Sequence, residues 1–224
     1  MSMRPEEPPE PMVAVDRAGD VTVIRLSDPS RSNALTPAMV LGLTRAVAAA
    51  EGKALVLCAE GRNFCSGGDH KSFVELSLDD RRQHLAEIKA LMIAIRAASL
   101  PTVACVQGAA IGGGLELALH CDLIVAADDA RFQLPQVATG ARVHRTSYGA
   151  LIDRTGMGFA RRMVLLGDAL PAASALAMGL IDHVSRGADL HATALSMAAH
   201  LAAQPRETME HARKALAGTA IGPA

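Results

Sequence analysis

The sequence predicts an α/β fold with a helical extension at its C-terminal end. Short apolar strands alternate with helices up to Leu134, and helical patterns follow Pro135. Of the 224 residues, 50% are hydrophobic, which is enough to form one substantial core. We therefore expect a single domain over residues 13–224, whose helical part begins at about residue 144. Residues 1–12 are rich in Pro and Glu, which predicts a disordered tail.

The strands are predicted from alternating patterns or from short apolar runs. Gly19 and Asp20 interrupt the first alternating segment, which indicates a turn between two strands. The predicted strands lie within residues 13–26, 53–58, 102–106, 123–127 and 131–134.

The helices are predicted from capping residues and from apolar residues at helical spacing. Thr36 and Pro37 provide a cap and a favourable first position, and Ser77 with Asp80 resembles a capping box. The predicted helices cover residues 36–50, 77–98 and 115–120 and most of the chain after Pro135, with breaks at Gly156, Gly167, Gly179 and Gly187.

Composition argues against several classes of protein. Aromatic residues make up 2% of the chain, and the formal net charge is −1. The chain therefore has neither the aromatic side chains that stack on bases nor the net positive charge that attracts nucleic acid. The four cysteines have no CxxC spacing and the histidines no metal-like spacing with carboxylates, so we expect neither disulfides nor a metal site. We also expect no signal peptide and no membrane helix, and hence a cytoplasmic protein.

Two glycine-rich loops, each following a predicted buried strand, are the main candidates for a site. The first contains Gly67 and Gly68, and the second contains Gly112, Gly113 and Gly114. Glycines let backbone amides approach a ligand, and two converging amides form an oxyanion hole. The alternative is that these glycines only make turns. The spacing in the second loop lacks the third glycine of a dinucleotide fingerprint.

Glu116 lies in the first turn of the helix that the second loop opens. A carboxylate at this place can act on a ligand held by the loop. It can equally serve only as a favourable charge near the positive end of the helix dipole.

The order and spacing of several motifs resemble the crotonase (enoyl-CoA hydratase/isomerase) superfamily over about Val13 to Lys214. The matching segments are Asp28-Pro29, Ser32-Asn33-Ala34-Leu35, Phe64-Cys65-Ser66-Gly67-Gly68-Asp69, Leu100-Pro101-Thr102-Val103-Ala104, Gly108 through Ala118, Cys121-Asp122, Ala130 through Pro135, and Ala177 through Asp182. Each segment alone is weak evidence, whereas the whole set is highly specific.

The resemblance implies a crotonase-like spiral of ββα turns, assembled as a homotrimer or a dimer of trimers. It implies an acyl-coenzyme A substrate, with coenzyme A present only as part of the thioester and no permanently bound cofactor, in a setting such as fatty acid metabolism. The oxyanion amides map onto Gly68 and Gly113. The coenzyme A site maps onto the strip Gly68, Asp69, His70 and Lys71, and Arg31 is a further candidate for the phosphates.

The chain departs from the family pattern at the catalytic carboxylates. Glu116 matches the first carboxylate of the hydratases, but Gln136 stands where the second would be. A neutral amide cannot donate and recover a proton, and such groups each contribute roughly 10²–10⁴ in rate, so conventional hydratase activity is in doubt.

The next segment also departs from the family. His144 falls where certain isomerases and dehalogenases carry a carboxylate, so it is a candidate base, because imidazole titrates near neutral pH. Alternatively, His144 and Tyr148 only fill space left by lost glycines. Relatives also usually continue further beyond the equivalent of Lys214, so the C-terminal part is shorter than is usual in the family.

The sequence therefore predicts an acyl-CoA enzyme of the enoyl-CoA hydratase/isomerase type. An oxyanion hole would stabilise a thioester enolate, and Glu116 would be the one family carboxylate. Isomerisation, decarboxylation and thioester hydrolysis stay open as reactions. A non-catalytic acyl-CoA binder or regulatory protein is the alternative from another class.

Overall fold

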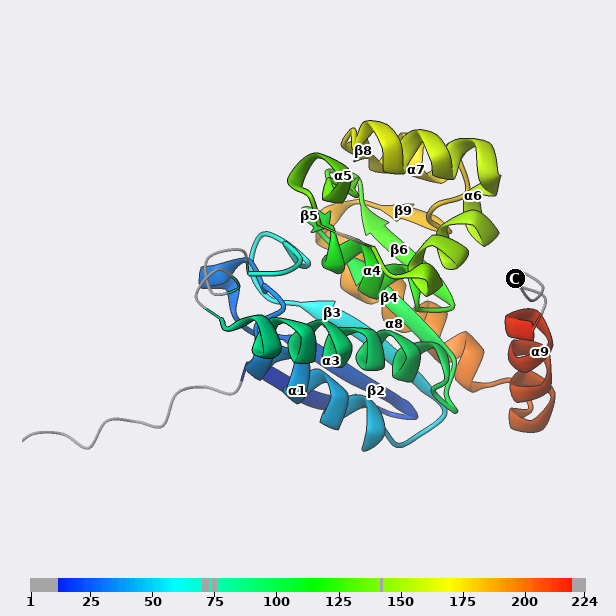
Figure 1. Ribbon diagram of the computed structural model, residues 1–224. Coiled ribbons are helices and arrows are strands. Elements are labelled where there is room, and N and C mark those ends of the chain that lie inside the picture. The colour runs from blue at the N-terminus through cyan, green and yellow to red at the C-terminus, as the bar shows by residue number, and fades with distance from the viewer. Residues whose placement is uncertain (1–11, 70–72, 74–75, 142, 219–224) are drawn as a thin grey trace, which may run out of the picture.

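In the computed structural model of the protein, which describes residues 12–69, 73, 76–141 and 143–218, a six-stranded sheet forms the centre of the fold (Figure 1). The first strand is antiparallel to the second and all other neighbours are parallel. In spatial order the strands are β1 (Val13–Ala18), β2 (Val21–Leu26), β3 (Ala54–Ala59), β4 (Thr102–Val106), β6 (Leu123–Ala127) and β9 (His183–Ser185).

Helices cover both faces of this sheet. The helices α1 (Pro37–Ala48) and α3 (Leu78–Arg96) pack on one face, and α8 (Leu190–Ala202) packs on the other (Figure 1). Val56 and Val103 point to the α8 side, and Leu55 and Leu57 point to the opposite side. Because successive side chains face opposite layers and both layers are apolar, the central strands are continuous hydrophobic runs, as the sequence predicted.

A second, three-stranded sheet consists of β5 (Ala109–Ile111), β7 (Arg131–Gln133) and β8 (Leu170–Pro171). The order β4-β5 is followed by α4 (Gly113–Leu119), and β6-β7 is followed by α5 (Gln136–Thr139). Strand pairs each followed by a helix are the expected ββα turns, so the fold class predicted for the chain is confirmed.

The C-terminal part contains α6 (Arg145–Leu166), α7 (Ala172–Ala177), α8 and α9 (Arg206–Gly218), with a short 3-10 turn at Gly187–Asp189. A second 3-10 turn, Pro29–Arg31, lies between β2 and α1. The expected break at Gly156 is a kink with φ of 74° inside α6, and Gly167 ends that helix in the left-handed conformation. In the part of the chain described here, no helix has the length and apolar character needed to span a membrane.

The predicted N-caps of α1 and α3 are confirmed, whereas the helix predicted over residues 115–120 begins at Gly113. The Thr36 hydroxyl accepts a hydrogen bond from the Met39 N–H at 3.2 Å, and Ser77 accepts from the Asp80 N–H at 3.1 Å. Residues 1–11 of the expected tail lie outside the described residues. Met12, the last residue of that tail, pairs with the fold, because its carbonyl accepts from the Ser27 N–H at 2.8 Å.

Three short strands were missed. The glycines from Gly108 to Gly114 predict a turn where Ala109–Ile111 forms a strand, and β8 and β9 lie in the segment after Pro135 that is predicted to be helical. Strands of two or three residues are too short to show a period of two. Their pairing depends on neighbours that are distant in sequence, such as β6 beside β9.

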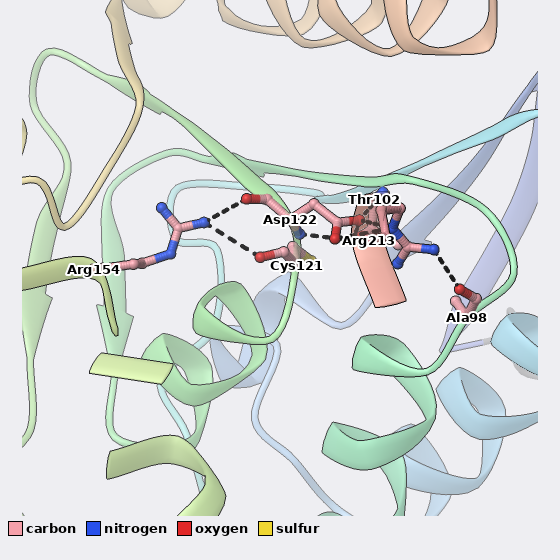
Figure 2. Close-up of polar contacts among 6 residues, drawn as sticks. All are labelled: Ala98, Thr102, Cys121, Asp122, Arg154 and Arg213. Carbon is pink, nitrogen blue, oxygen red and sulfur yellow. Dashed lines mark hydrogen bonds and ion pairs between the residues drawn. The ribbon is translucent and has the colours of Figure 1, made fainter. Parts of the chain in front are cut away.

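Arg213 fixes α9 to the central sheet at the N-terminal ends of β4 and β6 (Figure 2). Its Nε lies 3.0 and 2.9 Å from the two carboxylate oxygens of Asp122, and its Nη1 donates to the Ala98 carbonyl at 2.6 Å. Asp122 also accepts from the Thr102 N–H and hydroxyl. Arg154 donates to the Asp122 carbonyl at 2.7 Å, which connects α6 to the same corner.

Candidate functional site

The two glycine-rich loops predicted from the sequence meet at one point. The Cys65 N–H donates to the Ala109 carbonyl at 3.0 Å, and the Ile111 N–H donates to the Cys65 carbonyl at 3.0 Å. A Cβ atom at Gly114 would lie 2.1 Å from the Cys65 carbonyl oxygen. Only glycine therefore allows this approach, and the glycines do more than make a turn.

Gly68 and Gly113, the two predicted oxyanion residues, lie side by side. A Cβ atom built on Gly113 would be 3.8 Å from the Gly68 nitrogen. Gly113 is the first residue of α4, so its N–H has no acceptor within the helix. Neither amide donates a hydrogen bond to any residue that the structure describes. Two backbone donors with no acceptor among the described residues therefore lie close together.

Glu116 lies in the first turn of α4 and is 7% exposed. Both of its carboxylate oxygens accept hydrogen bonds, one from the Gln136 Nε2 at 3.0 Å and the other from the Ser147 hydroxyl at 2.6 Å. Burial raises the pKa of Glu116 above its usual range, and hydrogen bonds from Ser147, the His144 backbone and Gln136 partly oppose this rise.

Gln136 is the first residue of α5, and its side chain packs against Gly112, the residue before Gly113. The hydrogen bond to Glu116 fixes the direction of the amide, because the opposite orientation would bring two oxygens together. The Gln136 Oε1 is buried and has no hydrogen-bond partner among the described residues. Gln136, which is predicted to occupy the place of the second carboxylate, is therefore in direct contact with Glu116.

Ser147 is a site residue that the sequence analysis did not single out. It lies in the first turn of α6, is 1% exposed and contacts a carboxylate 31 positions earlier in the chain. The sequence contains no local signal for it, because a serine inside a predicted helix is ordinary and the contact depends on the tertiary packing of α6 against α4.

His144 is the N-cap of α6. Its Nδ1 accepts from the Thr146 N–H at 3.2 Å and lies 2.9 Å from the Thr146 hydroxyl. Burial, followed by the charge of Lys89, lowers the pKa of His144. The backbone of His144, and not its ring, is among the groups that lower the pKa of Glu116. The structure thus shows a capping role for the imidazole, and its role as a base stays a prediction.

The segment predicted to bind coenzyme A is described only in part. Arg31 lies 3.5 Å from the Asp69 carboxylate, so these two candidates are brought together beside Gly68. His70 and Lys71 lie outside the described residues. Among the described residues no group of His, Cys, Asp and Glu could hold a metal ion. All four cysteines are free and buried.

Comparison with known proteins now identifies the family. The model of the enoyl-CoA hydratase/isomerase family matches residues 16–221. The chain belongs to this family, and hence to the crotonase superfamily. Among the motifs that suggested the family, Phe64 through Asp69 forms the first loop, and Gly108 through Ala118 covers β5, the second loop and most of α4.

Three relatives illustrate the similarity. The protein named "Probable enoyl-CoA hydratase echA6" of Mycobacterium tuberculosis (strain CDC 1551 / Oshkosh) is 34% identical over 208 residues, which are 92% of this chain and 82% of that protein. The 2,3-dehydroadipyl-CoA hydratase of Escherichia coli K12 is 31% identical, covering 90% and 80%. A solved structure titled as a putative enoyl-CoA hydratase from Thermobifida fusca YX in complex with acetoacetyl-CoA has a TM-score of 0.85 at 28% identity, covering 93% and 88%.

Proposed function

We propose that this protein binds an acyl-CoA thioester and stabilises the negative charge that develops on the thioester oxygen. The observation that carries this proposal is the juxtaposition of the Gly68 and Gly113 amides, neither of which donates to a described residue. Each such donor is worth roughly 2.7–4 kcal/mol in a transition state. The complex of a similar protein with acetoacetyl-CoA supports the choice of ligand.

Glu116 is the proposed proton-transfer group. Its ionised form accepts from Ser147 and Gln136, so it is held in one orientation, while burial keeps its pKa above the usual carboxyl range. A raised pKa brings a carboxylate closer to neutral pH, where an acid or base transfers protons best. Glu116 would remove a proton from carbon next to the thioester, or return one to it, while the two amides hold the enolate oxygen.

The reaction proposed is enolate chemistry with a single carboxylate. Gln136 can donate a hydrogen bond to Glu116 but cannot exchange a proton, so water addition with two carboxyl groups is disfavoured. Isomerisation, decarboxylation and thioester hydrolysis each pass through, or near, a thioester oxyanion. The backbone amides stabilise that charge whatever the side chains nearby.

The second candidate is an acyl-CoA binding protein without turnover. The hydrogen bonds around Glu116 favour it, because both oxygens of this carboxylate already accept from protein donors. For either candidate we propose that Arg31, Asp69, His70 and Lys71 meet the coenzyme. We also propose a homotrimer or a dimer of trimers, located in the cytoplasm.

The test is crotonyl-CoA hydration, measured as loss of the enoyl-thioester absorbance, in the wild type, Gln136→Glu and Glu116→Ala. Calorimetric binding of butyryl-CoA, which has no double bond to hydrate, is measured alongside. A slow wild type that binds butyryl-CoA and becomes active in Gln136→Glu supports the proposal. No binding of butyryl-CoA would overturn it. Binding without turnover of any acyl-CoA, unaltered by either substitution, would favour the second candidate.

A further inference from the structure

The buried imidazole of His84 lies on α3, outside the two loops and outside α4. His84 is 6% exposed, and its Nε2 lies 2.9 Å from the carbonyl oxygen of Leu35. A carbonyl only accepts, so Nε2 carries the proton and donates it. The Nδ1 has no hydrogen-bond partner among the described residues, and the Glu87 carboxylate at 3.9 Å is beyond hydrogen-bond range. Within the described chain, the imidazole of His84 is therefore hydrogen-bonded only to the Leu35 carbonyl.

Leu35 in turn contacts both glycine-rich loops. Its N–H donates to the Gly67 carbonyl at 2.8 Å. Its side chain packs against the other loop, since a Cβ atom at Gly113 would be 2.8 Å from the Leu35 Cδ1. Leu35 is fully buried, so it has a fixed place between the loops and α3. A displacement of Leu35 would change the position of both oxyanion amides.

The hydrogen bond from Leu35 acts on the peptide unit that supplies one of these amides. The Gly67 carbonyl and the Gly68 N–H belong to the same planar peptide, so they point in opposite directions. A donor that holds the carbonyl on one side therefore sets the direction of the N–H on the other. It also polarises the peptide, which makes the N–H a stronger donor.

We propose that His84 is a positioning residue for the oxyanion hole, acting through Leu35 on the Gly67–Gly68 peptide and on Gly113. This role rests on the proposed function, because it requires that the two amides bind a thioester oxygen. The role also explains why an imidazole occupies a buried place on α3 where an apolar side chain would satisfy packing.

The experiment uses butyryl-CoA labelled with carbon-13 at the thioester carbonyl. Difference infrared spectroscopy measures how far the carbonyl stretch moves to lower frequency when the ligand binds, which reports polarisation by the amides. The variants are His84→Phe, which keeps a ring without a donor, and His84→Gln, which keeps a donor. Ile95→Val is the matched control, since it changes packing of the same buried face of α3 without removing a hydrogen bond.

We expect the wild type and Ile95→Val to show the full shift, His84→Phe to lose most of it while still binding butyryl-CoA, and His84→Gln to recover it. A full shift in His84→Phe would overturn the role of His84 and leave the proposed function intact. Equal losses in His84→Phe and Ile95→Val would also overturn it, because packing alone would then be responsible. Butyryl-CoA bound by the wild type without any shift would overturn the proposed function itself.

A measurement on the wild type keeps the role testable if His84→Phe does not fold. Nitrogen-15 NMR of the histidine ring distinguishes the two neutral tautomers. The geometry requires a proton on Nε2 of His84. A spectrum with the proton on Nδ1 in the neutral ring would contradict donation to Leu35, and with it the proposed role.

Discussion

Gln136 donates a hydrogen bond of 3.0 Å to the carboxylate of Glu116, so the two residues predicted to match the carboxylate pair of the hydratases are in direct contact. Two carboxylates at this distance cannot readily both ionise, because like charges raise the pKa of one of them. With Gln136 in place, the ionised form of Glu116 gains a donor instead of a neighbouring charge. The pair is therefore built around one titrating group.

Replacing Glu116 with Gln should remove turnover while leaving binding in place. The amide has nearly the shape of the carboxylate but cannot exchange a proton, so we expect the rate to fall by about 10²–10⁴ for whichever acyl-CoA the wild type turns over. The dissociation constant of butyryl-CoA should change little, because the backbone amides are untouched. Steady-state kinetics and calorimetry check the two parts, and an unchanged rate would exclude Glu116 as the proton-transfer group.

Ser147→Ala should move the pH dependence of the reaction. The Ser147 hydroxyl donates to the ionised carboxylate and so lowers the pKa of Glu116, which burial has raised. Without this donor the pKa of Glu116 rises further, and the acid limb of the pH–rate profile should shift to higher pH if ionised Glu116 is the base. Ser185→Ala is the control, because Ser185 is also buried but bonds to Arg186 and Thr193. A profile that does not move would contradict the contact.

The elements that sequence reasoning found are those whose signal is local. The strand that contains Val103 is buried on both faces, so its sequence is an apolar run. Thr36 and Ser77 cap their helices through contacts with residues three positions away. The glycines of the two loops were found for a related reason. A close approach of two backbones leaves no room for a side chain, so it requires glycine, which the sequence shows directly.

The contacts that sequence reasoning missed connect residues distant in the chain. Ser147 reaches Glu116 across 31 positions, and His84 reaches Leu35 across 49. Serine and histidine are both ordinary inside a helix, so the sequence does not mark either residue. The first contact becomes visible only when α6 packs on α4, and the second only when α3 packs on α1. The strand β9 was missed likewise, because three residues beside β6 form no pattern of their own.

The stability of the protein should respond to Glu116→Gln in a pH-dependent way. Burial raises the pKa of Glu116 in the folded state above its unfolded value, so the stability gained from the protonated group is present at low pH and is lost as the pH rises through the folded pKa. A neutral Gln avoids this loss. We expect the free energy of unfolding of the variant, relative to that of the wild type, to be higher at pH 8 than at pH 5. Urea titrations at the two pH values test this. A relative free energy of unfolding that is higher at pH 5 than at pH 8 would contradict the prediction.

Arg213→Ala should loosen the attachment of α9 without altering acyl-CoA binding. The guanidinium is largely buried and donates to the Asp122 carboxylate and the Ala98 carbonyl (Figure 2). Hydrogen bonds to charged groups contribute about 1.5–3 kcal/mol each, so we expect a loss of about 2–4 kcal/mol in the free energy of unfolding.

Lys214→Ala is the matched control for Arg213→Ala. The neighbouring Lys214 forms an exposed ion pair with Glu210 within the same helix, and such pairs contribute about 0.3–0.5 kcal/mol. Hydrogen exchange should show faster exchange across α9 in Arg213→Ala and not in Lys214→Ala. Equal effects of the two substitutions would mean that Arg213 contributes no more than a surface charge, and that the contact with Asp122 does not hold this helix against the sheet.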